Sequence, residues 1–187
     1  MRIDGYLQSF CYFAEIIDEV RREFIFRDDI AAAAANLLRD MQINHNASLI
    51  VGVHARRGDI LQTAWTNWGL RAAEKKYFLK AFSLMKSKFP GRNMTFLVSS
   101  DDLKWCRENL LGKNVIVMPP ASPAVHLAVL SICDHVIMSG GTYGWWAGWL
   151  ANGDVIYHTG FIQNGTAFGD MIKRQQYYPP HWIGLGN

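Results

Sequence analysis

The hydrophobic pattern of the chain changes its period near residue 48. Over residues 6–26, and again over 28–41, apolar positions recur at the three- and four-residue spacing of amphipathic helices. Beyond residue 48, short runs rich in β-forming residues alternate with helical stretches. We expect strands at 49–54, 95–99, 115–118, 135–138 and 155–157, and helices at 74–89, 102–111, 124–132 and 142–150.

This alternation predicts an α/β fold in which a parallel sheet is covered by helices on both faces, because the strands read as continuous apolar runs. The 187 residues suit one domain, or one lobe of a larger enzyme. The one candidate seam lies at residues 44–46. We therefore expect a helical lead-in over 1–45 and an α/β body over 46–187.

Three polar loops follow strands of the predicted body, at residues 54–59, 99–102 and 139–144. The carboxyl ends of parallel strands meet at one edge of a sheet, and ligands of open α/β sheets bind in the crevice at that edge. We therefore expect the three loops to surround one site.

The first loop supplies positive charge. Arg56 and Arg57 keep their protons and offer forked donors that suit phosphate oxygens, while Asp59 can orient one of them. The alternative is an ordinary solvated loop. The tripeptide from Arg57 to Asp59 also matches an adhesion motif, but adhesion needs a protruding tip, and a loop in a sheet crevice is a poor one. His54 is either a satisfied buried histidine or a catalytic one.

The other two loops supply backbone donors and carboxylates. Gly140, Gly141 and Thr142 open a helix whose free N–H groups can bind an anion. Asp101 is either a helix cap or a ligand of a nucleoside. The chain has no phosphate-binding-loop motif with its lysine, and no G-x-G-x-x-G in the first turn. The residues alone predict a site for a nucleotide or another diphosphate.

Composition excludes several other classes. The net charge is +3, from 19 basic and 16 acidic residues, which is too small for a nucleic-acid-binding surface. The three cysteines have no zinc spacing and allow at most one disulfide, so we expect no metal. No apolar run reaches the roughly 18 residues of a membrane span, and no signal peptide opens the chain.

Three N-x-[ST] sequons begin at Asn46, Asn93 and Asn164. All three lie next to the ends of predicted elements. They make these asparagines candidate N-glycosylation sites and favour the secretory pathway.

Three ordered segments carry a resemblance to a known family. These are VGVHARRGD at 51–59, FLVSSDDLKWCREN at 96–109 and CDHVIMSGGTYGWWAGWLANGDVIY at 133–157. They resemble the motifs of the galactoside alpha-1,2-fucosyltransferases, and GYLQSFCYF at 5–13 and YYPPHWIGL at 177–185 resemble that family's flanking segments. The likeness covers nearly the whole chain in the right order. H-x-R-R-x-D alone is less specific, since other fucosyltransferases share it.

The resemblance implies the Rossmann-like donor lobe of a GT-B-type glycosyltransferase, anchored in the Golgi membrane and facing the lumen. Such an enzyme transfers L-fucose from GDP-beta-L-fucose to the 2-hydroxyl of a terminal beta-galactoside, with inversion and without a metal or cofactor. The alternatives are a fucosyltransferase of different linkage and a catalytically inactive GDP-sugar-binding fragment.

The resemblance also assigns roles to individual residues. Arg56 would grip the diphosphate with support from His54 and Arg57, while Asp59 would hold the loop. The residues that would bind the donor are Arg56, Arg57, Asp101, Ser139, Gly141, Thr142 and Tyr143. The candidate general bases are Asp59, Asp101 and His54.

The chain departs from the family pattern in two ways. It begins just before the G-Y-x-Q-S segment, so we expect the anchor, the stem and most of the first lobe to be missing. His126 also stands where the family pattern leads us to expect an acidic residue near the guanine.

Overall fold

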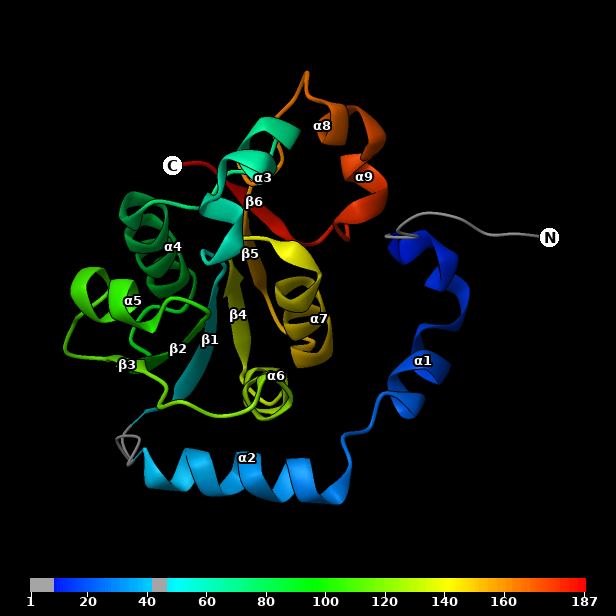
Figure 1. Cartoon of the computed structure of the whole chain (residues 1–187). Coiled ribbons are helices and arrows are strands. Elements are labelled where there is room, and N and C mark those ends of the chain that lie inside the picture. Colours follow the sequence, from blue (N-terminus) through cyan, green and yellow to red (C-terminus); the bar gives the residue numbers. More distant parts are fainter. Residues whose placement is uncertain (1–8, 42–46) are drawn as a thin grey trace.

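A computed structural model describes residues 9–41 and 47–187, and within them the chain forms one six-stranded parallel sheet (Figure 1). The strand order is β3-β2-β1-β4-β5-β6, and every neighbouring pair is parallel. The strands are β1 (Leu49–Ala55), β2 (Met94–Ser100), β3 (Val115–Val117), β4 (His135–Met138), β5 (Val155–His158) and β6 (Ile183–Leu185). The predicted parallel sheet is confirmed, with β6 as an additional strand.

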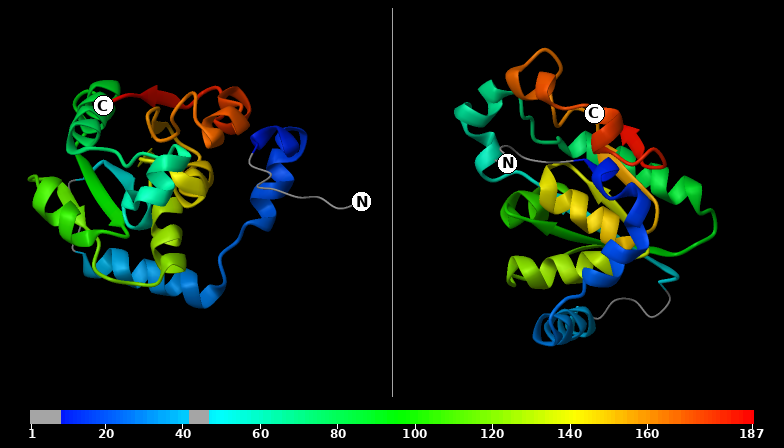
Figure 2. Two further views of the ribbon diagram at one scale, coloured as in Figure 1. Left: turned by 45° about the horizontal axis from the view of Figure 1, so that its top comes forward. Right: turned by 90° about the vertical axis from the view of Figure 1, so that its right-hand side faces the viewer.

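Helices cover both faces of this sheet, as predicted. Helices α4 (Lys75–Lys88) and α5 (Leu103–Asn109) lie on one face, and α6 (Pro123–Ser131) and α7 (Gly141–Ala151) on the other (Figures 1 and 2). After β1 the chain adds β2 and β3 on one side of β1, and it then returns to place β4 on the other side of β1. In such a doubly wound sheet the loops after β1 and β4 diverge and leave a crevice between them.

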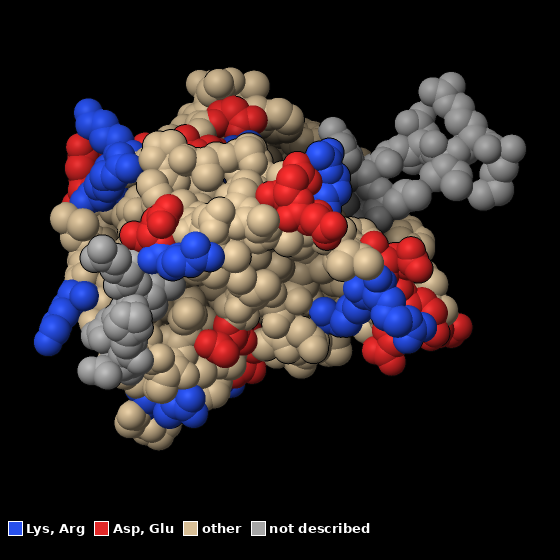
Figure 3. Space-filling view, turned by 90° about the horizontal axis from the view of Figure 1, so that it is seen from below, with Lys and Arg blue, Asp and Glu red and all other residues tan. Residues whose placement is uncertain are grey.

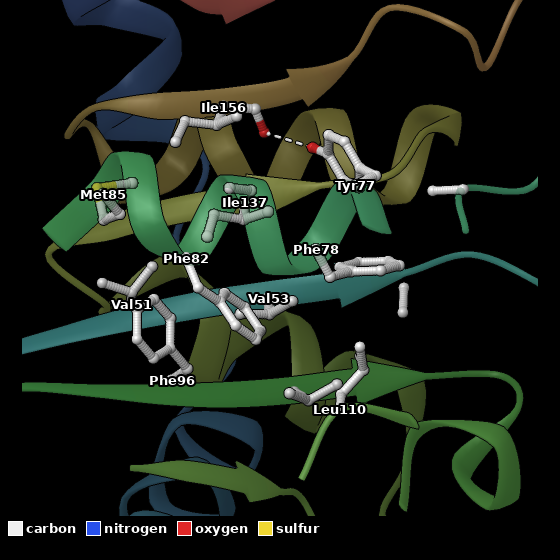
Figure 4. Packing of buried hydrophobic residues seen from close by; sticks show 14 of the residues in the cluster. Val51, Val53, Tyr77, Phe78, Phe82, Met85, Phe96, Leu110, Ile137 and Ile156 are labelled. Carbon is white, nitrogen blue, oxygen red and sulfur yellow. Dashed lines mark hydrogen bonds between the residues drawn. The ribbon is translucent and has the colours of Figure 1, made fainter. Parts of the chain in front are cut away.

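The core between the sheet and α4 explains why the strands read as continuous apolar runs. Val51 and Val53 of β1 pack with Tyr77, Phe78 and other buried residues of α4 (Figure 4). The side chains of these four residues have no exposed surface. Both faces of the sheet are covered in this way, so alternation of polar and apolar residues along the central strands is absent.

The lead-in packs against the second face of the sheet layer. Helix α2 (Asp28–Asp40) lies against α6, and its Ala34 is 2% exposed. The segment before it is colored dark blue in Figure 1 and runs along α7. The 1–45 boundary stays a prediction, since residues 42–46 lie outside the described part of the chain.

The prediction of one continuous helix over residues 6–26 was wrong. Its described part forms two 3-10 turns, Phe10–Tyr12 and Ala14–Ile16, and then the short helix α1 (Ile17–Glu23). The backbone turns at Phe13, where φ is −132° and ψ is 14°. This turn places the Phe13 ring 5.4 Å from the ring of Trp149, so packing against α7 overrides the helical period.

Several short elements were not predicted. They are the 3-10 turn Asp59–Leu61, α3 (Thr63–Trp68), α8 (Ala167–Met171), α9 (Arg174–Tyr177) and β6. Capping residues define the ends of these short elements, which have no long hydrophobic period. Gly69 ends α3 with φ of 112°, and the Thr166 hydroxyl accepts from the Gly169 N–H at the start of α8.

The surface opposite the carboxyl ends of the strands carries both signs of charge. Figure 3 shows basic and acidic residues interspersed on this face, without an extended basic area. This agrees with the small net charge of +3. In residues 9–41 and 47–187, no helix combines the length and hydrophobicity needed to cross a membrane.

We predict that Tyr77→Phe destabilises the fold without altering its packing. The buried Tyr77 hydroxyl donates to the Met138 carbonyl at 2.7 Å. It also lies 3.2 Å from the Ile156 carbonyl (Figure 4). Its removal should lower the free energy of unfolding by about 1 kcal/mol, measured by urea denaturation. Tyr12→Phe is the matched control, because Tyr12 is 69% exposed and should tolerate the change. Equal effects of the two variants would contradict the prediction.

Candidate functional site

A cleft of about 630 Å³ opens at the carboxyl ends of the strands. Its size falls within the range of small-molecule sites. The three predicted loops all reach it, together with residues from α3, α6 and α8. Its lining is His54, Arg56, Asp59, Ile60, Trp65, Trp68, Leu70, Ser99, Ser100, Asp101, Leu103, Pro120, Ala121, Pro123, His126, Gly141, Thr142, Tyr143, Phe161, Phe168 and Tyr177.

Arg56 is the one arginine or lysine among the described residues that line the cleft. Its guanidinium forms ion pairs with Asp59 and Asp101, through Nη2 and Nη1 respectively. About 29% of the side chain remains exposed. The two carboxylates hold the guanidinium in one orientation, so its position is fixed before a ligand arrives.

The backbone of the Arg56 loop is tied to two neighbouring strand ends. The Arg56 N–H donates to Ser139 Oγ at 2.7 Å, and the Arg57 N–H donates to Asp101 Oδ1 at 2.8 Å. Gly58 passes so close to Asp101 that an added Cβ would lie 2.5 Å from its Oδ2. Ser139 and Asp101 therefore shape this loop. Ser139 is 1% exposed and does not belong to the residues that line the cleft.

Arg57 is directed away from the cleft. Its Nη1 donates to the Ala73 carbonyl at 3.0 Å, and its Nε lies 3.5 Å from Asp102 Oδ2. The guanidinium also lies over the Trp105 ring, 3.7 Å from the centroid. With 12% of its side chain exposed, Arg57 fastens the loop to α5, while Arg56 faces the ligand space.

His54 is buried at the end of β1, with 5% of its surface exposed. Its Nδ1 has no hydrogen-bond partner and lies against Gly144, where an added Cβ would be 2.4 Å away. Burial, and next the positive charge of Arg56, lower the pKa of His54 to about 3. The imidazole is therefore neutral at physiological pH and adds no charge to the cleft.

The start of α7 provides backbone donors to the same space. Gly141 has φ of 78°, a conformation that favours glycine, and no acidic side chain occupies the first turn. Gly141, Thr142 and Tyr143 line the cleft. Free N–H groups at a helix start attract anions, so α7 and Arg56 together present an anion-binding surface.

Polar residues occupy the end of the cleft near β2 and β3. His126 Nε2 lies 2.9 Å from the Pro119 carbonyl, and its Nδ1 lies 3.1 Å from Ser99 Oγ. A carbonyl only accepts, so Nε2 donates the proton and Nδ1 accepts from the serine hydroxyl. His126 thus holds the connection between β3 and α6, and both of its nitrogens are already in use.

The opposite end of the cleft is apolar and was not predicted. We define the apolar wall as Ile60, Trp65, Trp68, Leu70, Phe161 and Phe168, which line the cleft. Two of these residues are half-buried tryptophans on α3, at i and i+3. That spacing on a six-residue helix next to the H-x-R-R-x-D loop was the sequence feature from which this wall could have been found.

Asn93 and Asn164 of the candidate sequons are exposed, and Asn46 lies outside the described residues. N-glycosylation at all three stays a prediction. Among the described residues, no group of three or more His, Cys, Asp or Glu side chains is placed to hold a metal ion.

A doubly wound sheet with a cleft at its switch point is an α/β architecture in which ligands typically bind at the carboxyl ends of the strands. The chain belongs to glycosyl transferase family 11, whose sequence profile matches residues 1–186. This confirms the resemblance drawn from the three motifs.

Named relatives are similar over almost the whole chain. The mouse galactoside 2-alpha-L-fucosyltransferase Sec1 and the pig galactoside alpha-(1,2)-fucosyltransferase 2 are each 31% identical over 191 residues. These alignments include 99% of this chain but 51% and 56% of the relatives, so the chain spans about half their length.

A solved structure shares the fold. The crystal structure of POFUT1 in complex with GDP matches with a TM-score of 0.52 at 15% identity, over 71% of this chain and 47% of that chain. At this identity the match supports the architecture alone.

We predict that Gly144→Ala destabilises the protein through His54. The new methyl group would lie 2.4 Å from His54 Nδ1 and 3.2 Å from Met138 Cβ, both buried. Overpacking of this kind costs about 1–3 kcal/mol of unfolding free energy. Gly112→Ala is the control, because its nearest new contact is an ordinary 3.4 Å to Val115. Urea denaturation of both variants tests this, and equal stabilities would refute it.

We also predict that His54 makes stability pH-dependent. The unfolded histidine takes up a proton near its ordinary pKa of 6.5, while the folded one resists protonation until its pKa of about 3. Stability present above pH 6.5 is therefore lost as pH falls toward 3. Between pH 7 and 5, this loss should be on the order of 2 kcal/mol. Denaturation at both pH values should show a smaller loss in His54→Asn, and an unchanged loss would rule out the assignment.

Proposed function

We propose that this chain is the donor-binding lobe of a galactoside alpha-1,2-fucosyltransferase. The whole enzyme transfers L-fucose from GDP-beta-L-fucose to the 2-hydroxyl of a terminal beta-galactoside. The observation that carries the proposal is the shared cleft of Arg56 and the α7 start, in a chain of glycosyl transferase family 11. The names of its relatives supply the sugar and the linkage.

During the reaction, negative charge grows on the leaving diphosphate, in the part of the cleft that carries hydrogen-bond donors. The bond between fucose C1 and the phosphate oxygen breaks, and the electron pair leaves with GDP. The acceptor oxygen attacks C1 from the opposite face, so the anomeric configuration inverts, and a base takes the hydroxyl proton. Arg56 and the N–H groups of Gly141 and Thr142 would stabilise the leaving diphosphate because these residues line the cleft and the N–H groups of a first helical turn have no partner within the helix.

These groups make the transfer feasible without a metal ion. Arg56 supplies a permanent positive charge and the helix start supplies partial positive charge, which are the roles a divalent cation has in other phosphate sites. The donor is a substrate, so no cofactor is needed. The oxocarbenium-like sugar needs a well-placed acceptor more than a strong nucleophile.

The remaining residues support this arrangement. Ser139 and Arg57 fix the loop, and Tyr143 lines the cleft with its hydroxyl donating to the Pro123 carbonyl at 2.6 Å. The candidate general bases stay Asp59, Asp101 and His54. Asp59 and Asp101 are paired with Arg56 and would have to exchange that partner for the acceptor hydroxyl.

The second candidate function is a GDP-sugar-binding unit without transferase activity. The observation in its favour is that the chain spans about half of its curated relatives, and the beta-galactoside acceptor site is expected to draw on the other half. Donor binding without transfer would identify it. A fucosyltransferase of different linkage remains the alternative within the enzymes, and the linkage of the product separates the two.

The whole protein would act in the Golgi lumen as a single-pass membrane protein. The three sequons and the relatives' role in glycan synthesis support this location. Residues 1–45 would then be the end of the first lobe, and 46–187 the donor-binding lobe.

We predict that Arg56→Ala abolishes or strongly weakens donor binding while the fold persists. The variant loses charge-assisted hydrogen bonds and leaves Asp59 and Asp101 unneutralised beside the diphosphate. Affinity for GDP should fall at least about tenfold, since each such bond contributes roughly 1.5–3 kcal/mol. Calorimetric titration with GDP and GDP-fucose, without added metal, measures this.

Arg39→Ala is the control for that experiment. Arg39 is an exposed arginine in the last turn of α2, and its loss changes the net charge equally. Circular-dichroism melts establish that both variants are folded. If folded Arg56→Ala binds GDP as tightly as the wild type, the proposed function is wrong.

A further inference from the structure

The apolar wall has no role in the leaving-group chemistry described above. Its six residues face the cleft with aromatic and aliphatic surface, and none of them is charged. Ile60, Leu70 and Phe161 are nearly fully buried and support Trp65 and Phe168, which are partly exposed. A wall of this kind removes apolar ligand surface from water. Its side chains carry no polar atoms apart from the indole nitrogens of Trp65 and Trp68, so a hydroxyl packed against the ring faces finds no hydrogen-bond partner.

Two chain segments far apart in sequence form this wall and are joined to each other. Leu70 and Ile162 form an antiparallel bridge. The Arg71 N–H donates to the Phe161 carbonyl at 2.9 Å, and the Gln163 N–H donates to the Gly69 carbonyl at 2.8 Å. Helices α3 and α8, which carry the outer part of the wall, lie close together at the top of Figure 1 and in the views of Figure 2.

The contact between the two helices is made by aromatic rings. The ring centroids of Trp68 and Phe168 are 4.5 Å apart, and those of Trp65 and Trp68 are 5.6 Å apart. This packing holds the rings in place without a ligand. The wall is therefore preformed, and binding a sugar there would not have to order it first.

The two ends of the cleft differ in what they can recognise. The end near β2 and β3 carries the polar residues Ser99, Ser100 and Asp101 beside the loop residues Pro120 and Ala121. A guanine ring needs hydrogen-bond partners along its edges, so it fits this polar end. With the diphosphate held between Arg56 and the start of α7, the transferred sugar then extends toward the apolar wall.

We propose that the apolar wall, with Trp68 and Phe168 at its center, binds the methyl group of the 6-deoxy sugar of the donor and selects against its 6-hydroxylated counterpart. This inference rests on the proposed function. L-Fucose differs from L-galactose in carrying a methyl group in place of a hydroxymethyl group. The ring faces bury the methyl group, whereas a hydroxyl packed against the same faces would lose water without gaining a partner.

The test compares three ligands on this chain by calorimetry: GDP, GDP-beta-L-fucose and GDP-beta-L-galactose. Wild type should bind GDP-fucose at least about tenfold more tightly than GDP-galactose, the size expected for one group in an apolar pocket. Trp68→Ala should bring that ratio close to one and weaken GDP-fucose more than GDP. Phe168→Ala should act in the same direction and serves as a second variant if Trp68→Ala melts early.

Phe24→Ala is the matched control. Phe24 stacks on Trp146, with ring centroids 4.5 Å apart, on the lead-in and away from the residues lining the cleft. In Phe24→Ala, the ratio of the affinities for GDP-fucose and GDP-galactose should equal that of the wild type. A change as large as in Trp68→Ala would show that loss of any aromatic residue suffices, and would overturn the inference.

The outcomes separate this inference from the proposed function. A folded wild-type chain that binds neither GDP nor GDP-fucose overturns both. A chain that binds GDP and GDP-fucose, but holds GDP-galactose as tightly as GDP-fucose, overturns only the inference. An equal loss of GDP and GDP-fucose affinity in folded Trp68→Ala also overturns it, because the wall would then contact the nucleotide rather than the sugar.

Discussion

The site depends on two backbone hydrogen bonds that hold the turn after β1 from either side. Ser139 follows β4 and accepts from the Arg56 N–H, and Asp101 follows β2 and accepts from the Arg57 N–H. These bonds exist because parallel strands place their carboxyl ends at one edge of the sheet, so residues 44 and 83 positions apart in the sequence meet. They also set the opposite directions of the two adjacent arginines. One guanidinium reaches the cleft and the other lies on Trp105.

The sequence predicted the regular part of the molecule because periodicity and burial agree there. The five predicted strands and the helices between them follow apolar patterns, and the loops after these strands carry the glycines and charges that indicated the cleft. The helix over residues 6–26 failed because its aromatic residues serve tertiary packing on α7. Trp65, Trp68 and Phe168 of the apolar wall lie on helices of six and five residues, which are too short for a periodic pattern.

Side-chain roles within the site were less predictable than its place. Arg56 and Arg57 are chemically identical neighbours, and only the fold decides which one faces a ligand. Likewise, the single sequence offered no means of seeing that His126 is held by Ser99 and the Pro119 carbonyl. Such partners come from distant segments, so they depend on topology rather than on local spacing.

The pairing of Arg56 with Asp59 and Asp101 has a consequence for selectivity among anions. Asp59 and Asp101 compensate the positive charge of Arg56, so an incoming anion must compete with these two carboxylates for the guanidinium. A small monovalent ion offers one set of oxygens and no further contacts. It therefore gains little by displacing them. A pyrophosphate linked to a base and a sugar can contact the guanidinium, the start of α7 and both ends of the cleft at once. The ion pairs of Arg56 therefore favour the binding of large, multiply charged ligands over small ions of the surrounding solution.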